Sequence, residues 1–578
     1  MRRKAGVVAA IALTCGLASA GEAKTLTYCA AGIPEGFDPA PYTTPATFDA
    51  SSQPLYDRLV AFEPGTTRVG PGLAERWEVS DDGLEYTFHL RRGVSFHTTD
   101  DFTPSREFNA DDVIFTFDRQ MNPSDPYFGY AGGQWLYFAG MAMPELLSAV
   151  EKIDDDTVKF VLNVPYASFI ANLAMDFASI VSKEYADLAR AEDRMEDLNR
   201  KPVGTGPFQL VAYEENATIR YRANPDYWGG KPAIDDLVFV IAPDGGERRR
   251  MLEAGECQVM ADPDPDDIAA MKENPDIVVV QQERLDIAYL AYNTTQPPFD
   301  NPAVRRALNM AIDKQAIVDT VYGPAGTVAK GPLPPTVWSS NDAIADDPYD
   351  PEAARAMLEE AGVSELTMSL WAMQTPRSYN PDARRMAELI RADLAEVGVE
   401  AVIVSYEWGE YLRRTAAPDR DGAVLFGWTG DNGDPGSFLA PLLGCDAVGL
   451  SNRAQWCDEA FDALILRART VTDPAERARL YQQAQAIFKE QAPWAPIAHS
   501  LATVAMSTSV ENYVIDPLGR QNFAAVDVSA DAAGGAGEGS SAGPASPASQ
   551  AGQDGQAGQA PPESPAGVGQ GQPAGSDY

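Results

Sequence analysis

The chain has 578 residues, more than one hydrophobic core usually organises, so we expect two or more domains. Its 84 acidic and 45 basic residues give a net charge of −39, and such a surface repels nucleic acid and anionic lipid. We therefore expect no nucleic-acid partner, whereas the hydrophobic content of 45% is that of an ordinary globular protein.

The first 23 residues have the pattern of a secretory signal peptide. Arg2 to Lys4 are basic, Ala5 to Leu17 form an apolar run, and small residues follow, so we expect cleavage after Ala20 or Ala23. No later segment approaches about 20 uninterrupted apolar residues, the length of a membrane span. The sequence therefore predicts an exported, soluble, periplasmic protein.

Five cysteines are present, and the first, Cys15, lies in the predicted signal peptide. The preceding Ala12-Leu13-Thr14 lacks Leu at the third position before the cysteine, so we expect no lipid anchor there. The other four cysteines reach an oxidising compartment with the exported chain. Because their number is even, we expect two disulfide bonds, with three possible pairings. These four are Cys29, Cys257, Cys445 and Cys457. Neither a C-x-x-C pair nor a histidine cluster accompanies them, so no metal site is predicted.

Strand patterns dominate the first part of the chain. Lys24 to Cys29 alternates like a strand. Residues 73–119 are predicted as a strand, a turn, a second strand and a helix that begins at Asn109. Asp111 and Asp112 in the first turn favour that helix start.

From residue 276 onward, strand and helix patterns alternate. The predicted strands are 276–282, 287–293, 366–371, 400–406 and 423–426. The predicted helix starts are Asn301-Pro302, Asn380-Pro381 and Asp473-Pro474. This alternation predicts an α/β domain over about 284–500. A further strand, Leu501 to Met506, is expected to return the chain to the first domain, so that two crossings form a hinge.

Three predicted strand ends carry side chains suited to a ligand. The strand at 423–426 leads into a loop rich in Gly, Asn and Asp, 427–435, which presents two carboxylates and an indole. An upstream strand leads into a loop carrying Arg377, and the strand at 400–406 is followed by Trp408. Open α/β sheets usually hold ligands at such strand ends. An acid, a base and flat apolar faces suit a small zwitterion better than a chemical reaction.

Three stretches resemble the family 5 extracellular solute-binding proteins, the peptide and nickel receptors of ABC importers. They are residues 73–119, Pro202-Val203-Gly204-Thr205-Gly206-Pro207-Phe208 and Asn224-Pro225-Asp226-Tyr227-Trp228-Gly229. The resemblance runs from about Lys24 to Val528 and implies an α/β, two-lobe periplasmic-binding-protein fold. It also implies a monomeric binding protein without enzyme activity or cofactor. Such a protein would capture dipeptides between its lobes and deliver them to the membrane permease subunits of an ABC importer.

Pattern and resemblance together predict the domain organisation. Lobe I is expected at 24–283, with an additional subdomain at about 56–205, and lobe II at 284–501. Residues 502–528 are expected to return to lobe I. Residues 529–578 consist mainly of Gly, Ala, Ser, Pro and Gln, which bury too little surface to offset chain entropy. We expect this tail to be disordered.

The resemblance also implies which residues hold the ligand. At the matching positions of the family, the acid that corresponds to Asp431 takes the peptide's amino group. The arginine that corresponds to Arg377 takes its carboxylate. Neighbouring positions that match the family's pocket are Ser378, Tyr379, Trp408, Trp428, Thr429 and Gly430.

Two further expectations come from the resemblance alone. Thr43-Thr44-Pro45 matches the first-lobe side of the cleft, where the family tends to have small residues including Gly. Pro45 removes a backbone donor there, which bears on fine specificity. The family pattern pairs Cys29 with Cys257 and Cys445 with Cys457.

An acid and an arginine at opposite ends of a slot would measure ligand length. A buried ammonium and a buried carboxylate each cost several kcal/mol unless they are paired. The termini of a dipeptide lie only about 5–7 Å apart, so a longer peptide would leave one charge unpaired. Arginine suits the carboxylate end because its fork can bond both oxygens.

Other functions compete with dipeptide capture. A receptor for haem, glutathione, a nickel chelate or a longer peptide would use the same fold. The three histidines, His89, His97 and His499, are widely separated and are predicted to be structural. An exported hydrolase is disfavoured, because the globular part has neither an H-E-x-x-H motif nor a nucleophile elbow.

Overall fold

The structure is a computed structural model, and it describes residues 23–130, 135–363 and 365–529. Almost all of the predicted signal peptide and of the predicted tail lie outside these residues. None of the helices in the described part combines the length and apolar character that a membrane span needs.

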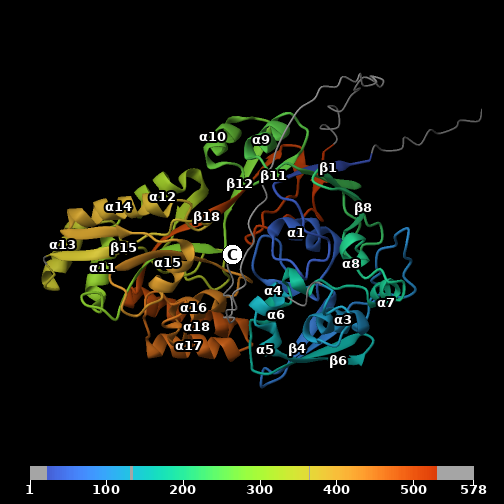
Figure 1. Cartoon of the computed structure of the whole chain (residues 1–578), viewed down its shortest axis with the longest axis horizontal. Helices are drawn as coiled ribbons and strands as arrows, with labels where there is room; N and C mark the ends of the chain where they lie inside the picture. The colour runs from blue at the N-terminus through green and yellow to red at the C-terminus, as the bar shows by residue number, and fades with distance from the viewer. Residues whose placement is uncertain (1–22, 131–134, 364, 530–578) are drawn as a thin grey trace, which may run out of the picture.

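One long strand joins the two halves of the molecule. β18 (Trp494–Ser507) is buried along most of its length. Its first half pairs with β13 (Asp286–Tyr292), and its second half pairs with β11 (Val259–Ala261) and β12 (Ile277–Glu283). The buried side chains on the two sides form separate main cores. The chain is therefore an α/β protein of two lobes, which lie side by side in Figure 1.

The chain crosses between the lobes twice, once from β12 to β13 and once in the middle of β18. The buried carboxylate of Asp286 ties the two crossings together, since it accepts hydrogen bonds from the backbone N–H and the hydroxyl of Ser500 at 2.9 and 2.6 Å. His499 Nδ1 lies 2.7 Å from the carbonyl oxygen of Asp286. The sequence predicted a separate returning strand at 501–506. In the structure these residues are the second half of β18, because the strand stays buried through the crossing at His499 and Ser500.

Lobe I carries one end of a twelve-stranded sheet, in the order β18-β11-β1-β10-β9-β8. A disulfide joins Cys29 in β1 to Cys257 just before β11, which is the expected pairing, and a small buried cluster surrounds it. The elements of this part are β1 (Thr25–Ala30), α1 (Pro45–Ala50), α2 (Ser52–Leu55), β8 (Phe208–Glu214), β9 (Thr218–Ala223), β10 (Asp236–Ile241), α9 (Gly245–Glu253), α10 (Pro265–Glu273), β19 (Val510–Glu511) and β20 (Asp527–Val528).

A second, four-stranded sheet in the order β4-β5-β7-β6 belongs to the same lobe and shares its core. Its elements are β2 (Val60–Phe62), β3 (Val69–Pro71), β4 (Ala74–Val79), β5 (Glu85–Leu90), α3 (Ala110–Met121), α4 (Leu136–Gly140), α5 (Met143–Leu146), β6 (Leu147–Asp154), β7 (Thr157–Leu162), α6 (Phe169–Asn172), η1 (Asp176–Ala178), α7 (Lys183–Ala191) and α8 (Asp197–Arg200).

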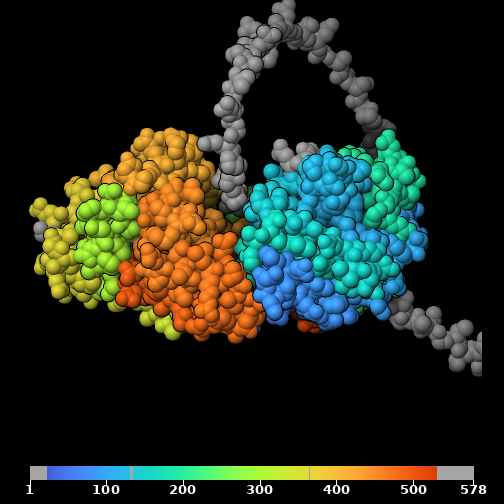
Figure 2. All heavy atoms as spheres, turned by 90° about the horizontal axis from the view of Figure 1, so that it is seen from below, coloured from blue at the N-terminus to red at the C-terminus, as the bar shows by residue number. Residues whose placement is uncertain are grey.

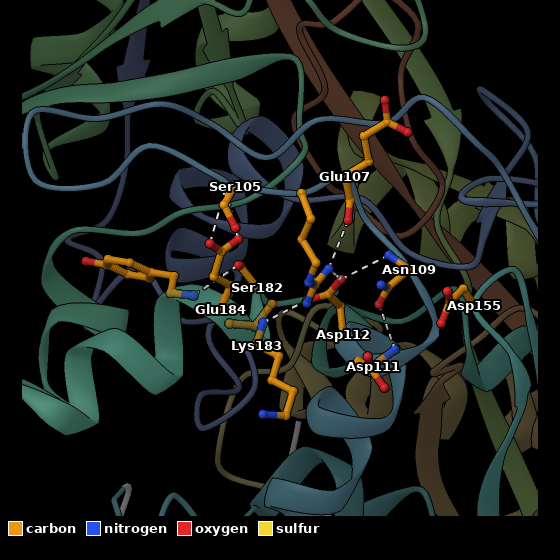
Figure 3. Close-up of polar contacts among 12 residues, drawn as sticks. Ser105, Glu107, Asn109, Asp111, Asp112, Asp155, Ser182, Lys183 and Glu184 are labelled. Carbon is orange, nitrogen blue, oxygen red and sulfur yellow. Dashed lines mark hydrogen bonds and ion pairs between the residues drawn. The ribbon is translucent and has the colours of Figure 1, made fainter.

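One buried carboxylate organises the helices of this part (Figure 3). Asp112 in the first turn of α3 accepts two hydrogen bonds from Arg106, at 2.7 and 2.8 Å, and closes a capping box with Asn109. It also accepts from the backbone N–H of Lys183 at the start of α7. The predicted helix start at Asn109 is confirmed, and the same acid fixes the start of a second helix.

Lobe II carries the other end of the large sheet, in the order β16-β15-β17-β13. Its further elements are α11 (Pro302–Met310), α12 (Lys314–Val321), η2 (Gly323–Ala325), β14 (Gly326–Val328), α13 (Pro351–Glu360), β15 (Leu366–Trp371), α14 (Ala383–Glu396), β16 (Val399–Val404), α15 (Trp408–Thr415), β17 (Ala423–Thr429), α16 (Gly436–Leu443), η3 (Cys445–Ala447), α17 (Glu459–Thr470) and α18 (Pro474–Gln491). The second disulfide joins Cys445 and Cys457, again as expected.

Two predicted boundaries in lobe II were wrong. The helix predicted from Asn380-Pro381 is α14, which begins at Ala383 because the side chain of Asp382 caps it. The strand predicted to end at Phe426 continues to Thr429, because Gly427, Trp428 and Thr429 pair with β13. The indole therefore projects from a strand and not from a loop.

Candidate ligand-binding site

The end of β17 is shaped by a close contact with the Arg377 loop. A side chain at Gly427 would place its Cβ 2.1 Å from the ring of Tyr379, so only glycine fits beneath this ring. The carbonyl oxygen of Tyr379 accepts a hydrogen bond of 2.5 Å from the hydroxyl of Tyr322. The Arg377 loop therefore packs on β17 through Tyr379.

Arg377 is held above an aromatic cluster. Its backbone forms a two-way bridge with Asn380, with both hydrogen bonds at 3.0 Å. Its guanidinium carbon lies 4.2 Å from the ring centre of Trp408, a cation–π contact. Trp408 in turn stacks on Phe426 and Tyr411, with ring centres 6.0 and 6.1 Å apart. The cation is thus positioned by packing, and no carboxylate in the described part of the chain pairs with it.

Asp431 follows β17 directly and is a largely buried acid. Among the described residues none donates a hydrogen bond or a salt bridge to its carboxylate. Burial raises the pKa of Asp431 to about 6, and the positive charge of Arg520 only partly opposes this. A buried carboxylate without a partner is costly for a fold, and it is a ready site for a ligand cation.

Asp434, the second acid of the same loop, has a different place. Both of its oxygens accept from Arg477 Nη2, at 3.1 and 2.8 Å, and one also accepts from the backbone N–H of Gly436. The sequence placed both carboxylates of the loop at a strand end but predicted only Asp431 as a ligand-binding residue. The charge of Asp434 is neutralised by an arginine of α18.

Several donors around Arg377 have no protein partner. The Nε atom of Arg377 and the indole nitrogens of Trp408 and Trp428 are buried, and no hydrogen-bond acceptor among the described residues reaches them. Buried donors of this kind usually bond to protein or water. Such unpartnered donors suit a ligand that supplies acceptors, such as the carboxylate and carbonyl oxygens of a peptide.

The remaining predicted positions contribute less directly. Ser378 is exposed, Thr429 pairs with Asp286 in the sheet, and Gly430 donates its N–H to the carbonyl oxygen of Leu285 at 2.6 Å. Gly430 lies against the ring of Phe438, which leaves no room for a side chain.

The first-lobe positions Thr43, Thr44 and Pro45 lie at the start of α1. Thr44 Oγ1 bonds to Glu35 and Thr47, and Pro45 is the first helical residue, where a backbone N–H has no helical partner. Among the described residues, the side-chain hydrogen bonds of Thr44 stay inside lobe I and do not reach Asp431 or Arg377.

Lobe I faces this site through residues that sequence reasoning missed. Arg520, which acts on Asp431, is held by Asp176 and lies 5.0 Å from the ring centre of Phe48 in α1. The loop itself touches lobe I, since Asn432 Nδ2 donates to Asn172 Oδ1 at 2.7 Å. These partners are far apart in sequence and have no shared motif, so no local signal could have found them.

The histidines are not at the site. His89 lies 3.3 Å from Glu78, and His97 is buried between the backbones of Gly204 and Gly206. Burial lowers the pKa of His97 to about 4. Across the described ranges no group of three or more His, Cys, Asp or Glu side chains is arranged to hold a metal ion.

Comparison with known proteins gives the family. The family model described as "Bacterial extracellular solute-binding proteins, family 5 Middle" matches residues 68–449. The chain belongs to this family. Family 5 proteins bind solutes and are not a family of enzymes. The expected two-lobe fold is confirmed by this membership and by the two cores of the structure.

Two relatives illustrate the range of family 5 proteins that resemble this one. The dipeptide-binding protein of Escherichia coli is 51% identical over 514 residues, which are 89% of this chain and 96% of the relative. Heme-binding protein A of Haemophilus influenzae is 49% identical over 505 residues, 87% of this chain and 92% of the relative.

Two solved structures differ in how well they superpose. HbpA2 from Haemophilus parasuis is 44% identical and has a TM-score of 0.85, covering 87% of this chain and all of that chain. The dipeptide-binding protein from Pseudoalteromonas in complex with Met-Leu is 40% identical, covers 88% of this chain and all of that chain, and has a TM-score of 0.65.

Proposed function

We propose that this family 5 protein captures dipeptides between its lobes in the periplasm and delivers them to the permease of an ABC importer. The observation that carries the proposal is a pair of charged side chains on lobe II that form no ion pair within the described part of the chain. Asp431 is a partly buried acid without a partner among the described residues, and Arg377 is a cation held by an indole and not by an acid. Asn432, the residue after Asp431, contacts lobe I.

Each charge suits one end of a peptide. A ligand ammonium would neutralise Asp431 in a place where water is scarce, and a ligand carboxylate would bond to Arg377. The unpartnered indole N–H groups of Trp408 and Trp428 offer further donors to peptide oxygens. Aromatic walls tolerate variable ligand side chains, so the two charges supply the selectivity and the rings supply general affinity.

The comparisons support the same proposal. The similar protein from Escherichia coli is named for dipeptide binding, and the similar Pseudoalteromonas structure holds Met-Leu. That complex superposes less well than HbpA2 although identity and coverage are nearly equal. A whole-chain score falls in this way when two lobes turn relative to each other, which supports closure on the ligand.

Haem is the second candidate, because a relative at 49% identity is named for heme binding. Trp408, which stacks on the buried rings of Phe426 and Tyr411, offers a flat apolar face, and Arg377 could pair with a propionate. Against it, none of the three histidines lies at the site to ligate iron.

The test is to identify what the protein carries and binds. Ligand released from purified protein by unfolding is analysed by mass spectrometry, and the stripped protein is titrated with Ala-Ala and with haem in a calorimeter. The proposal predicts a mixture of dipeptides and tight binding of Ala-Ala. Release of haem alone, with no heat on adding dipeptides, would reject it in favour of the second candidate.

A further inference from the structure

A pocket lies between the lobes, next to Asp434 of the loop that also carries Asp431. Its volume is about 570 Å³, within the range of small-molecule sites. Lobe I supplies the β2–β3 hairpin, Trp77 of β4 and Ile170 of α6, and lobe II supplies Trp338 and the start of α18. We call it the interlobe pocket. None of the predicted ligand-binding residues lines it.

Contacts between the lobes hold the pocket in place. Thr67 Oγ1 donates to the carbonyl oxygen of Thr336 at 3.2 Å, and the N–H of Ala167 donates to the carbonyl oxygen of Arg469 at 2.7 Å. In Figures 1 and 2 the orange helices α17 and α18 lie directly against the blue and cyan segments of lobe I. The pocket is therefore part of the surface along which the lobes meet.

A buried arginine on the pocket wall has a free donor. Arg477 is 7% exposed, and its Nε and Nη2 atoms are used by Ala468, Asp434, Ser168 and Tyr481. Among the described residues no acceptor bonds to its Nη1. Its guanidinium is also fixed in orientation, with its carbon 5.3 Å from the ring centre of Trp338 and 5.6 Å from that of Tyr481.

The rest of the lining favours an amphipathic anion. Two half-buried indoles, Trp77 and Trp338, provide flat apolar surface. At the rim Arg68 is exposed and forms no ion pair within the described part of the chain. Glu63 on the same hairpin is also exposed and repels an anion. Arg477 and Asp434 neutralise each other, so the pocket offers an acceptor the free Nη1 donor of Arg477 and, at the rim, the guanidinium of Arg68.

We infer that the interlobe pocket binds a small carboxylate with a flat apolar body. The carboxylate lies beside Arg477 Nη1 and Arg68, and the apolar body lies between Trp77 and Trp338. Arginine is well suited to such a head group, and indoles are suited to such a body. Because both lobes contribute, an occupant binds one lobe arrangement better than another and so biases closure. This inference does not depend on the proposed dipeptide function.

Three probes with one body and different head groups test it: 3-phenylpropionate, 3-phenylpropan-1-ol and 3-phenylpropylamine, titrated into the full-length mature protein by calorimetry. Changing Arg477 itself would strand Asp434, so the rim is varied instead. The variants are Arg68→Gln, Glu63→Gln and, as a control for the candidate site, Arg377→Gln. All four proteins are first compared by thermal unfolding.

The carboxylate should bind at least about tenfold more tightly than the alcohol or the amine, since charge-assisted hydrogen bonds differ from neutral ones by about that much. Arg68→Gln should weaken its binding, Glu63→Gln should strengthen it, and Arg377→Gln should leave it unchanged. Equal binding of the three head groups, or loss of carboxylate binding in Arg377→Gln with retention in Arg68→Gln, would overturn the inference. Absence of any binding at millimolar concentration would also overturn it.

Discussion

Asp431 and Asp434 are three residues apart in one loop, yet they serve different purposes. Asp434 is paired with Arg477 and supports the fold, whereas Asp431 is partly buried and has no partner among the described residues. The proposed difference between a structural acid and a ligand-binding acid therefore lies in their partners and not in their local sequence. Matched substitutions at the two positions separate the roles.

Asp431→Asn should weaken Ala-Ala binding by roughly 100-fold or more, since removing one partner of a buried charge pair costs several kcal/mol. Calorimetric titration measures this. Asp434→Asn should instead lower the free energy of unfolding, because it leaves Arg477 buried without its acid. Wild-type affinity in Asp431→Asn would remove Asp431 from the site.

The raised pKa of Asp431 predicts a pH dependence of stability. The pKa of Asp431 is about 6 in the folded protein and 3.8 in the unfolded chain, so the folded state binds the proton more tightly. Asp431 thus destabilises the ligand-free fold above pH 6, by about 2–3 kcal/mol, and this cost disappears as the pH falls toward 4. Ligand-free Asp431→Asn should therefore unfold at a higher temperature than wild type at pH 7.

The same comparison at pH 4 serves as the control, because there the two proteins should have nearly equal stability. The difference between variant and wild type is the informative quantity, since burial also raises the pKa of Asp49 to about 7 and that of Asp516 to about 6. A less stable Asp431→Asn at pH 7 would show that the carboxylate has a stabilising partner.

At the scale of elements, the loop after β17 is supported by Thr67 of lobe I and by helix α16. Gly433 has φ +66° and lies against Thr67 of lobe I, and α16 follows at once. The Cys445–Cys457 disulfide closes a short segment at the end of that helix, and the N–H of Cys445 bonds to Asp462 in α17 at 2.9 Å. The disulfide thus ties the helix that supports the loop to its neighbour.

Removing this disulfide with Cys445→Ser and Cys457→Ser together should lower the free energy of unfolding by roughly 3 kcal/mol in the chain-entropy model for a loop of this length. Denaturant unfolding of wild type and variant measures the difference. An unchanged unfolding midpoint would show that the segment is already fixed by its hydrogen bonds.

The elements of lobe II were predictable where their signals are local. Asn301 before Pro302 and Asp473 before Pro474 cap α11 and α18 as expected. β17 was predicted too short, because the pairing of Trp428 with Ile287 depends on a strand 141 residues upstream. Long-range pairing of this kind overrides the turn propensity of a Gly-rich stretch.

The candidate site was likewise predictable only where its signals are local. Arg377 and Trp408 follow recognisable strands, and the resemblance to the family indicated their roles. The ion pair between Asp434 and Arg477 could not be predicted, since the arginine lies 43 residues away on the buried face of a helix. The contribution of Arg520 from lobe I likewise depends on the return of the chain through β18.

For the whole molecule, two crossings joined by Asp286 and Ser500 form a narrow connection between two separate cores. Such an arrangement permits rotation of the lobes as rigid bodies. Small-angle scattering should therefore show a smaller radius of gyration after Ala-Ala is added to stripped protein. N-acetyl-Ala-Ala, which lacks the ammonium, serves as the control and should cause no compaction.

An unchanged radius with bound Ala-Ala would show that the lobes do not close on the ligand.

The central claim, that Asp431 and Arg377 select a ligand by two charges at a fixed separation, is tested most directly by one displacement series. Ala-Ala, N-acetyl-Ala-Ala, Ala-Ala-amide and tri-alanine compete for stripped protein against a labelled dipeptide. Each blocked dipeptide lacks one charge, and each added residue extends the peptide by about 3.5 Å. Ala-Ala should displace the label at much lower concentration than the other three. Equal displacement by the blocked peptides or by tri-alanine would contradict the claim.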